Sequence, residues 1–144
     1  MGGCAQAPYR SALVMRNDAS ELARMAEWIE GVCTTARLSR RTSFALQLCL
    51  DEAAANIIAH GEGSTRAREI VVGIAREGAD VVLTVDDDGG PFDVTRVAPP
   101  DRPHTLEDAP VGGRGIQLIR RFSSSFEYRR KCGRNQLRMT FAEA

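Results

Sequence analysis

Carboxylates, a carboxamide and glycines occur together in three short segments whose spacing could serve chemistry. In the first segment, Asp51 to Asn56, the side chains of Glu52 and Asn56 are four residues apart. On a helix this spacing places both side chains on one face, one turn apart. Glu52 could then act as a general base, and the Asn56 oxygen could bind Mg²⁺, which prefers oxygen ligands. Taken alone, the pair also fits an ordinary exposed helix face.

The second segment, Val85 to Asp93, leaves an expected strand with three consecutive carboxylates, Asp86, Asp87 and Asp88. Because these carboxylates repel one another, we expect the fold to compensate them or to use them. One could accept a hydrogen bond from an exocyclic amine of a ligand, while Gly89 would let a ring approach the backbone. An acidic turn without a ligand is the alternative.

The third segment, Val111 to Ile119, opens with Gly112, Gly113 and Gly115 just before an expected helix. Glycines at this position expose backbone N–H groups at the positive end of the helix, where a phosphate can bind. The segment is not a P-loop, because no Gly-Lys-Ser/Thr follows. It is not the dinucleotide-binding fingerprint either, because no strand leads directly into it.

The pattern of apolar residues predicts the elements that must position these segments. Strands are predicted over 11–16, over the β-branched runs 70–74 and 81–85, and over 126–130 and 136–141. Helical spacing predicts a helix from Leu22, and further helices are predicted after Ser39 and over 112–122. Asp18 and Glu21 predict a capping box before the first helix. The second helix should end near His60, where Gly61 follows. Its apolar face is expected to comprise Phe44, Leu48, Ala55 and Ile58.

This order of elements predicts an α+β fold, a two-layer α/β sandwich. Strands adjacent in sequence can pair as hairpins in a mixed, mostly antiparallel sheet, with the helices packed on one face. Five of the six prolines fall between Pro91 and Pro110, so residues 94–111 should form an irregular loop. We find no internal repeat, and residues 1–144 are expected to form a single domain.

Composition excludes several classes of protein. The 144 residues carry 19 basic and 19 acidic side chains, which argues against a generally basic nucleic-acid binder. No apolar run is long enough to span a membrane, and the first ten residues have no apolar core of signal-peptide length. We therefore expect a cytoplasmic protein. Four dispersed cysteines and two histidines make a zinc site improbable, and reduced thiols are expected.

In this order and at these separations, the three segments resemble the nucleotide site of the GHKL superfamily of histidine kinase-like ATPases. Glu52 to Asn56 is similar to its N box, Asp87 to Asp93 to its first glycine box, and Gly112 to Ile119 to its second. The resemblance implies the Bergerat ATP-binding fold, with ATP and Mg²⁺ as cofactors. Residues 94–111 would then be a short ATP lid.

Within that superfamily the chain resembles the anti-sigma factor serine/threonine kinases of bacterial partner-switching systems. The Asp-x-Gly-x-Pro-Phe-Asp form at Asp87 to Asp93 and the Asn-x-x-x-His-Gly form at Asn56 to Gly61 carry this resemblance. It implies ATP-dependent phosphorylation of a Ser or Thr on a small STAS-type anti-sigma factor antagonist, and reversible sequestration of an alternative sigma factor. It also implies a homodimer, which the apolar segment Ala12 to Met15 favours as an expected edge strand. No direct contact with nucleic acid or membrane is expected.

The resemblance assigns a role to each matching residue. Glu52 would be the general base toward the acceptor hydroxyl, and Asn56 would coordinate Mg²⁺. Asp87 would receive the adenine amino group, Gly89 would leave room for the ring, and Phe92 would pack beneath the lid. The phosphates would be wrapped by the second glycine box, which comprises Gly112, Gly113, Arg114, Gly115 and Ile116.

Some positions leave alternatives open. His60 could contact the nucleotide or simply end its helix, and Asp86 and Asp88 are expected to be solvated neighbours of Asp87. Some relatives place a basic residue just before the second glycine box, where this chain has Pro110 and Val111. Either Arg102 or Arg114 could replace that residue at the terminal phosphate.

Two other functions remain alternatives to the kinase. One is a nucleotide-gated sequestering protein with little or no phosphotransfer; the presence of Glu52 favours the kinase. The other is the catalytic domain of a histidine kinase, but no dimerising helix pair with a phosphoacceptor histidine precedes the expected domain.

Overall fold

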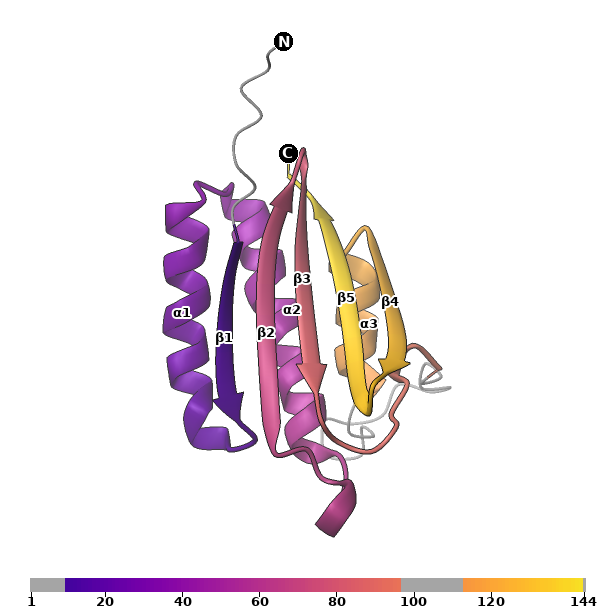
Figure 1. The fold of residues 1–144 in the computed structure, drawn as a ribbon. Coiled ribbons are helices and arrows are strands. Elements are labelled where there is room, and N and C mark those ends of the chain that lie inside the picture. Colours follow the sequence, from indigo (N-terminus) through magenta and orange to yellow (C-terminus); the bar gives the residue numbers. More distant parts are fainter. Residues whose placement is uncertain (1–9, 97–112, 144) are drawn as a thin grey trace.

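Five strands and three helices make up the part of the chain that the computed structural model describes, residues 10–96 and 113–143. The helices lie on one side of a single sheet (Figure 1). The strands are β1 (Arg10–Arg16), β2 (Glu69–Glu77), β3 (Asp80–Asp87), β4 (Ser125–Lys131) and β5 (Arg134–Ala142). The helices are α1 (Leu22–Thr35), α2 (Arg40–Ala59) and α3 (Gly113–Phe122), with 3-10 turns at Ala19–Glu21, Gly63–Thr65 and Val94–Arg96.

The sheet has the order β1-β2-β3-β5-β4, and each of these four pairs is antiparallel. Two tight hairpins set most of the register, because Gly78 and Gly133 adopt positive φ angles that a turn requires. The pairing of β3 with β5 places Asp87 opposite Asn135. The expected two-layer α+β fold is therefore confirmed.

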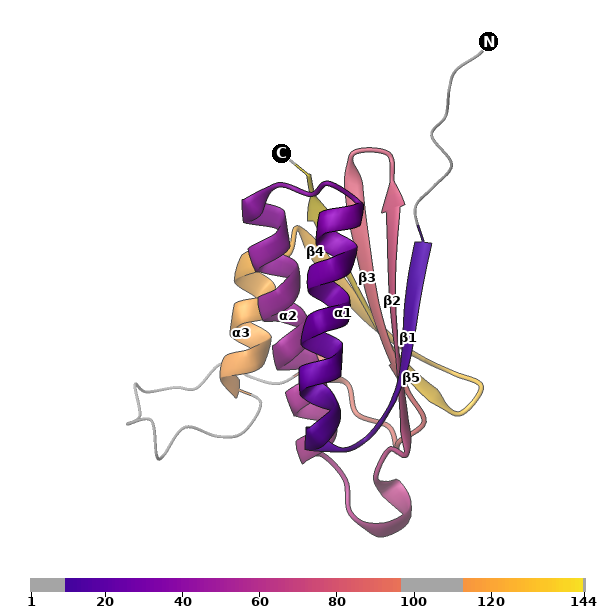
Figure 2. The ribbon, with the colours of Figure 1, turned by 90° about the vertical axis from the view of Figure 1, so that its left-hand side faces the viewer.

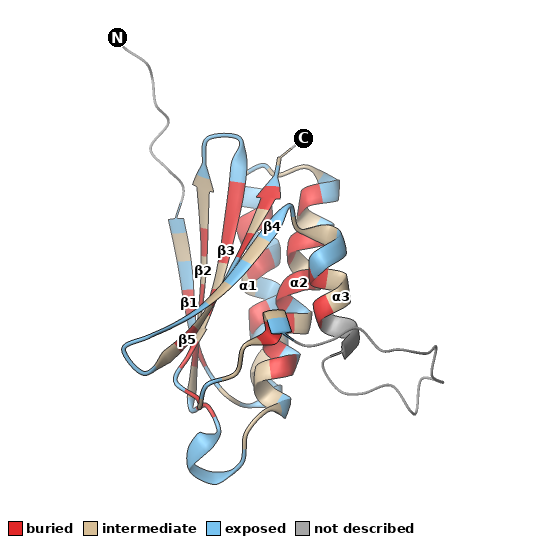
Figure 3. Cartoon of the chain, turned by 90° about the vertical axis from the view of Figure 1, so that its right-hand side faces the viewer, coloured by how far each residue is buried: buried red, intermediate tan, exposed pale blue. Residues whose placement is uncertain are grey.

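The core lies between the sheet and the helices, as the view along the sheet shows (Figure 2). Alternate side chains of β1, β2, β3 and β5 point toward the helices and are buried, and red segments mark both layers where they face each other (Figure 3). Leu83 of β3, Met139 of β5, Leu46 of α2 and Ile119 of α3 are fully buried there. The opposite face of the sheet carries no helix in the described part of the chain.

The predicted apolar face of α2 is wrong. Phe44 is 60% exposed, Ala55 is exposed, and Leu48 and Ile58 are only half-buried. Phe44 instead packs edge-on against Phe122 of α3, with ring centroids 5.8 Å apart. The buried face consists of pairs of consecutive residues that recur every four positions along the helix. Most of these residues are small, which lets the helix pack closely on the sheet. These residues are Ala45, Leu46, Cys49, Leu50, Ala53 and Ala54.

The ends of the helices follow local signals with one exception. Asp18 caps the 3-10 turn by accepting from the Ser20 amide, and Glu21 pairs with Arg24, so the predicted capping box does not form. Ser39 caps α2, where its side chain accepts from the amide of Thr42 at 3.2 Å. None of the described helices is long and apolar enough to cross a membrane.

Candidate active site

The fold brings the three predicted segments to one end of the molecule. The C-terminal half of α2, the end of β3 and the start of α3 lie together at the lower end of Figure 1, and the side view agrees (Figure 2). Helices α2 and α3 pack against each other, and α2 also contacts β3. Residues 52–56, 87–93 and 113–116 are therefore neighbours in space, although the chain separates them widely.

Asp87 ends β3 with its side chain turned toward the helices. It is 6% exposed, and its Oδ1 accepts hydrogen bonds from the Gly89 amide at 2.9 Å and from Asn135 Nδ2 at 3.0 Å. Within the described part of the chain, no hydrogen bond reaches its Oδ2. A buried carboxylate with one oxygen occupied and one available is suited to accept a hydrogen bond from a ligand amine.

The three consecutive carboxylates have three different surroundings. Asp86 points to the other face of the sheet, where Arg134 pairs with it and Gln136 donates to it at 2.9 Å. Asp88 accepts from the amides of Arg68 at 2.7 Å and Glu69 at 3.0 Å; burial opposes ionisation, but these bonds lower its pKa. The expectation that Asp86 is a solvated neighbour of Asp87 is wrong, because Asp86 is half-buried and paired, whereas Asp88 is exposed to solvent as expected and also accepts these two hydrogen bonds. Strand alternation and the turn separate the three charges. The hydrogen bonds and the ion pair given above compensate Asp86 and Asp88.

Gly89 is required by the carboxylate itself. A Cβ atom at this position would lie 2.9 Å from Asp87 Oδ1 and 3.2 Å from the Cβ of Ala67. The loop after β3 therefore turns back so tightly that only glycine fits without a shift. A glycine is expected here from the sequence because it would leave room for the ring of a ligand. The closeness of Asp87 is a second reason for a glycine at this position.

Asn135 was not predicted, and it is the centre of the polar contacts around Asp87. Besides Asp87, its Nδ2 donates to the carbonyl of Gly90 at 2.9 Å, while its Oδ1 accepts from Tyr128 Oη at 2.5 Å. The guanidinium of Arg130 donates to the Gly89 carbonyl at 2.6 Å. A polar residue in the inward-facing row of β5, among Leu137, Met139 and Phe141, is the sequence signal that could have identified it.

Glu52 and Asn56 lie on α2, as predicted. Asn56 is 8% exposed and makes no hydrogen bond to any described residue, and Glu52 is half-buried. Ala53 and Ile57, the next residues along the helix, line hollows beside Asp87. Burial, helped by the charge of Glu52, raises the pKa of Cys49 to about 12, so this thiol stays protonated and is no nucleophile.

Two stacked rings close the space next to Asp87. His60, the first residue after α2, lies on Phe92 with ring centroids 3.9 Å apart and planes 17° apart. The two hollows beside Asp87 measure about 10 and 20 Å³, room for about one water molecule each and far below the ~300–1,000 Å³ of a small-molecule pocket. A purine can therefore enter only if side chains such as Phe92 move.

Part of the predicted phosphate site lies outside the described residues. This holds for Gly112, for Arg102 and for residues 97–111 of the expected lid. Gly113, Arg114 and Gly115 form the first turn of α3, where backbone N–H groups lack helical partners, and the Arg114 side chain is not described. Ile116 is fully buried in the core, so only its backbone can face a ligand.

The start of the expected lid is anchored. Val94 to Arg96 form a 3-10 turn in which Val94 is buried, and Arg120 of α3 donates to the Thr95 carbonyl at 2.9 Å. The irregular segment predicted from Val94 therefore begins with a fixed turn, because Asp93 caps it through the amide of Thr95 at 2.9 Å.

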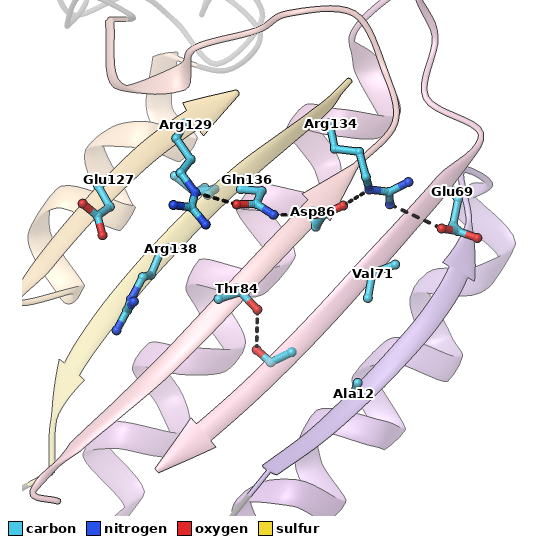
Figure 4. A pocket seen from close by; sticks show the side chains of 12 residues that line it. Ala12, Glu69, Val71, Thr84, Asp86, Glu127, Arg129, Arg134, Gln136 and Arg138 are labelled. Atoms are coloured by element: carbon cyan, nitrogen blue, oxygen red, sulfur yellow. Dashed lines mark hydrogen bonds and ion pairs between the residues drawn. The ribbon is translucent and has the colours of Figure 1, made fainter. Parts of the chain in front are cut away.

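A cavity larger than the two hollows beside Asp87 lies elsewhere, on the open face of the sheet (Figure 4). It measures about 700 Å³ and is lined by charged side chains, some of which are paired with one another. Arg134 lies between Asp86 and Glu69, and Arg129 donates to Gln136 at 2.7 Å (Figure 4). None of the residues predicted to bind the nucleotide lines this cavity. Because chemistry is better evidence of a site than size, we place the site around Asp87.

Comparisons with known proteins identify the family and the fold. Residues 15–141 match the family described as "Histidine kinase-like ATPase domain". The serine/threonine-protein kinase BtrW of Bordetella bronchiseptica is 34% identical over 113 residues, covering 78% of this chain and 80% of that protein. A crystal structure of the RsbU and RsbW domains of Rv1364c from Mycobacterium tuberculosis superposes with a TM-score of 0.67 at 12% identity. The superposition covers 94% of this chain and 32% of that one.

The chain belongs to the histidine kinase-like ATPase family, and the GHKL resemblance is confirmed. It is a homologue of a serine/threonine-protein kinase with an ATP-binding domain. The Mycobacterium structure shares the fold, and this chain spans about a third of that longer one.

Proposed function

We propose that this chain is an ATP-dependent serine/threonine protein kinase that binds the adenine of ATP at Asp87. The observation that supports this best is the buried Asp87 carboxylate, whose Oδ2 accepts no hydrogen bond from the described residues. A carboxylate only accepts hydrogen bonds, so it favours the 6-amino group of adenine. The homology to a serine/threonine-protein kinase supports protein hydroxyls as acceptors.

The remaining roles follow the chemistry of the neighbouring groups. Glu52, half-buried one helical turn before Asn56, is the general base toward the acceptor hydroxyl. The carboxamide oxygen of Asn56 fits Mg²⁺, because Mg²⁺ takes few protein ligands and completes its shell with water and phosphate oxygens. When bound, the ion neutralises phosphate charge. Backbone N–H groups at Gly113 to Gly115 hold the phosphates, together with Gly112 and the lid.

The biological setting is part of the same proposal. The acceptor is a Ser or Thr on a small STAS-type anti-sigma factor antagonist, and the chain sequesters an alternative sigma factor reversibly. A cytoplasmic homodimer is the form in which it would do so. The similarity to a domain named RsbW supports this setting at the level of the fold.

A phosphotransfer assay tests the proposal. A STAS-domain protein recovered with the chain from its native cells is incubated with γ-labelled ATP and the purified chain. We expect label on a Ser or Thr of the partner, and a fall of ~10²–10⁴-fold with Glu52→Ala, the usual contribution of a general base. Affinity for ATP should stay within a few-fold, because Glu52 faces the acceptor rather than the adenine.

The neighbouring carboxylate supplies a matched control. Asp51 is exposed on the same turn of α2 but points in another direction, so Asp51→Asn should transfer phosphate at the wild-type rate. If the wild-type chain binds ATP and the partner but transfers no label, the sequestering function replaces the kinase. If Glu52→Ala transfers at the wild-type rate, Glu52 is not the base.

A further inference from the structure

Asn135 occupies a position that controls the carboxylate of Asp87. The two residues face each other across the β3–β5 pair, and both are 6% exposed. Asn135 Nδ2 lies 3.0 Å from Asp87 Oδ1, 2.9 Å from the Gly90 carbonyl and 3.5 Å from the Gly89 carbonyl. One carboxamide on β5 therefore contacts both the acid and the loop that follows it.

The orientation of this carboxamide is fixed by its other end. Three donors converge on Asn135 Oδ1: the hydroxyl of Tyr128 at 2.5 Å, the amide of Phe92 at 3.2 Å and the guanidinium of Arg130 at 3.2 Å. If the amide turned over, its NH₂ group would face these three donors and its oxygen would face acceptors. Only one orientation satisfies all the contacts, so Nδ2 must point at Asp87.

This arrangement determines which oxygen of Asp87 a ligand meets. Oδ1 is held by two donors, the Asn135 amide and the Gly89 backbone N–H, which fixes the plane of the carboxylate. Because the carboxylate cannot rotate, Oδ2 is the oxygen that a ligand would meet. A fixed acceptor accepts from a 6-amino purine and repels a 6-oxo purine, whereas a carboxylate that can rotate discriminates less.

We infer that Asn135 is a positioning residue that sets the preference of the site for 6-amino over 6-oxo purine nucleotides. It acts through Asp87 and does not touch the base itself. This inference rests on the proposed function, because it requires that the purine binds at Asp87.

The experiment compares ATP with inosine triphosphate, which carries an oxo group where ATP carries the amine. Calorimetry gives both affinities for the wild-type chain and for Asn135→Leu, which keeps the branched shape but removes both polar atoms. ATP should bind about tenfold more weakly to the variant, the effect of losing a hydrogen bond to a charged group. Inosine triphosphate should bind within about twofold of wild type, so the ratio of the two affinities falls.

A purely structural role gives a different result. If Asn135 only supports the fold, the substitution weakens both nucleotides by the same factor and the ratio stays constant, which overturns the inference. Tyr128→Phe is the control: it removes one donor to Oδ1 but leaves Nδ2 in place, so the ratio should stay within about twofold. If Asn135→Leu does not fold, Asn135→Ser, whose hydroxyl is too short to reach Asp87, is measured in its place.

Asp87→Asn separates this inference from the proposed site. If Asp87→Asn lowers ATP affinity while Asn135→Leu leaves the ratio of affinities unchanged, Asp87 binds the adenine and the role of Asn135 is wrong. If Asp87→Asn leaves ATP affinity unchanged, the purine does not bind at Asp87, and both proposals fail.

Discussion

Gly89 is the single residue whose replacement should disturb the site most directly. In Gly89→Ala the new methyl group would lie 2.9 Å from Asp87 Oδ1 and 3.1 Å from the backbone nitrogen of Ala67. Because the loop must shift to relieve this contact, we expect a loss of stability of about 1–3 kcal/mol, typical of overpacking. ATP affinity should fall several-fold as Asp87 moves. Urea denaturation and calorimetry measure the two effects.

Gly31 provides the matched control for Gly89. It lies on α1, and a Cβ atom there would meet nothing within 4 Å. Gly31→Ala should therefore stabilise the chain by up to about 1 kcal/mol, since alanine is the better helix former, and should leave ATP affinity unchanged. Equal ATP affinity in Gly89→Ala and Gly31→Ala would show that the Gly89 loop does not position Asp87.

Among single residues, the sequence predicted those that are marked by a local pattern. It did not predict contacts that depend on how two strands pair. Asp87 and Gly89 could be predicted because they follow a strand in a recognisable order. The polar Asn135 in an otherwise apolar row of β5 signals a buried polar group, but its partner could not be predicted, because the contact with Asp87 spans 48 residues and depends on the register of β3 with β5. The compensation of Asp86 by Arg134 depends on the same register, which explains why Asp86 was expected to be solvated.

The N-terminus of α2 illustrates how one element is fixed to another. The Glu143 carboxylate, just after β5, accepts from the Ser39 amide at 3.1 Å and from the Thr42 hydroxyl at 3.1 Å. Burial opposes ionisation, but these bonds lower the pKa of Glu143 below its ordinary value of 4.5. A depressed native pKa means that the stabilisation is present above pH 4.5 and is lost as the pH falls through the native pKa.

Glu143→Gln should therefore destabilise the chain in a pH-dependent way. At pH 7 we expect a loss of about 1 kcal/mol, because charge-assisted hydrogen bonds at a helix start are removed. As the pH falls below 4.5 and through the native pKa, the difference between variant and wild type should shrink, since the native carboxylate is then protonated as well. Glu127→Gln, at an exposed position on β4, should change the stability by less than about 0.5 kcal/mol across this pH range. A Glu143→Gln effect that does not depend on pH would contradict this account.

Among elements, the positions of helices and strands were predictable, while the buried face of α2 was not. Ser39 and Gly61 gave its ends to within a residue, because capping and positive φ are local requirements. Its buried face includes small residues such as Ala54. Phe44 was expected in the core because it is large and apolar, but it is exposed. Because α2 packs against both the sheet and α3, the side chains that are buried are not simply the largest apolar ones.

For the whole molecule, the layers were predictable and the order of the strands was not. Strands adjacent in sequence were expected to pair as hairpins, which gives the pairs β2–β3 and β4–β5, because these contacts are close in sequence. The β3–β5 pair, which builds the site, joins strands that the lid and α3 separate. No local pattern specifies such a pair.

The edge of the sheet leads to the last prediction, which concerns assembly. Strand β1 is an edge strand, and Val14 on it is 56% exposed (Figure 1). Arg24 donates to the Val14 carbonyl at 2.7 Å and so covers only part of this edge. An apolar edge of this kind tends to be covered by another chain, and we predict that two copies pair through β1. Light scattering at micromolar concentration should give the mass of a dimer.

Two substitutions locate the contact. Val14→Lys places a charge on the β1 edge and should shift the protein toward monomer, as charged side chains do on natural edge strands. Thr84→Lys places the same charge on the open face of the sheet at β3, two strands from the edge, and should leave a β1-edge dimer intact. If Thr84→Lys dissociates the dimer and Val14→Lys does not, the two copies meet through the open face instead. A monomer in the wild-type chain, with and without nucleotide, would remove the homodimer from the proposed mechanism.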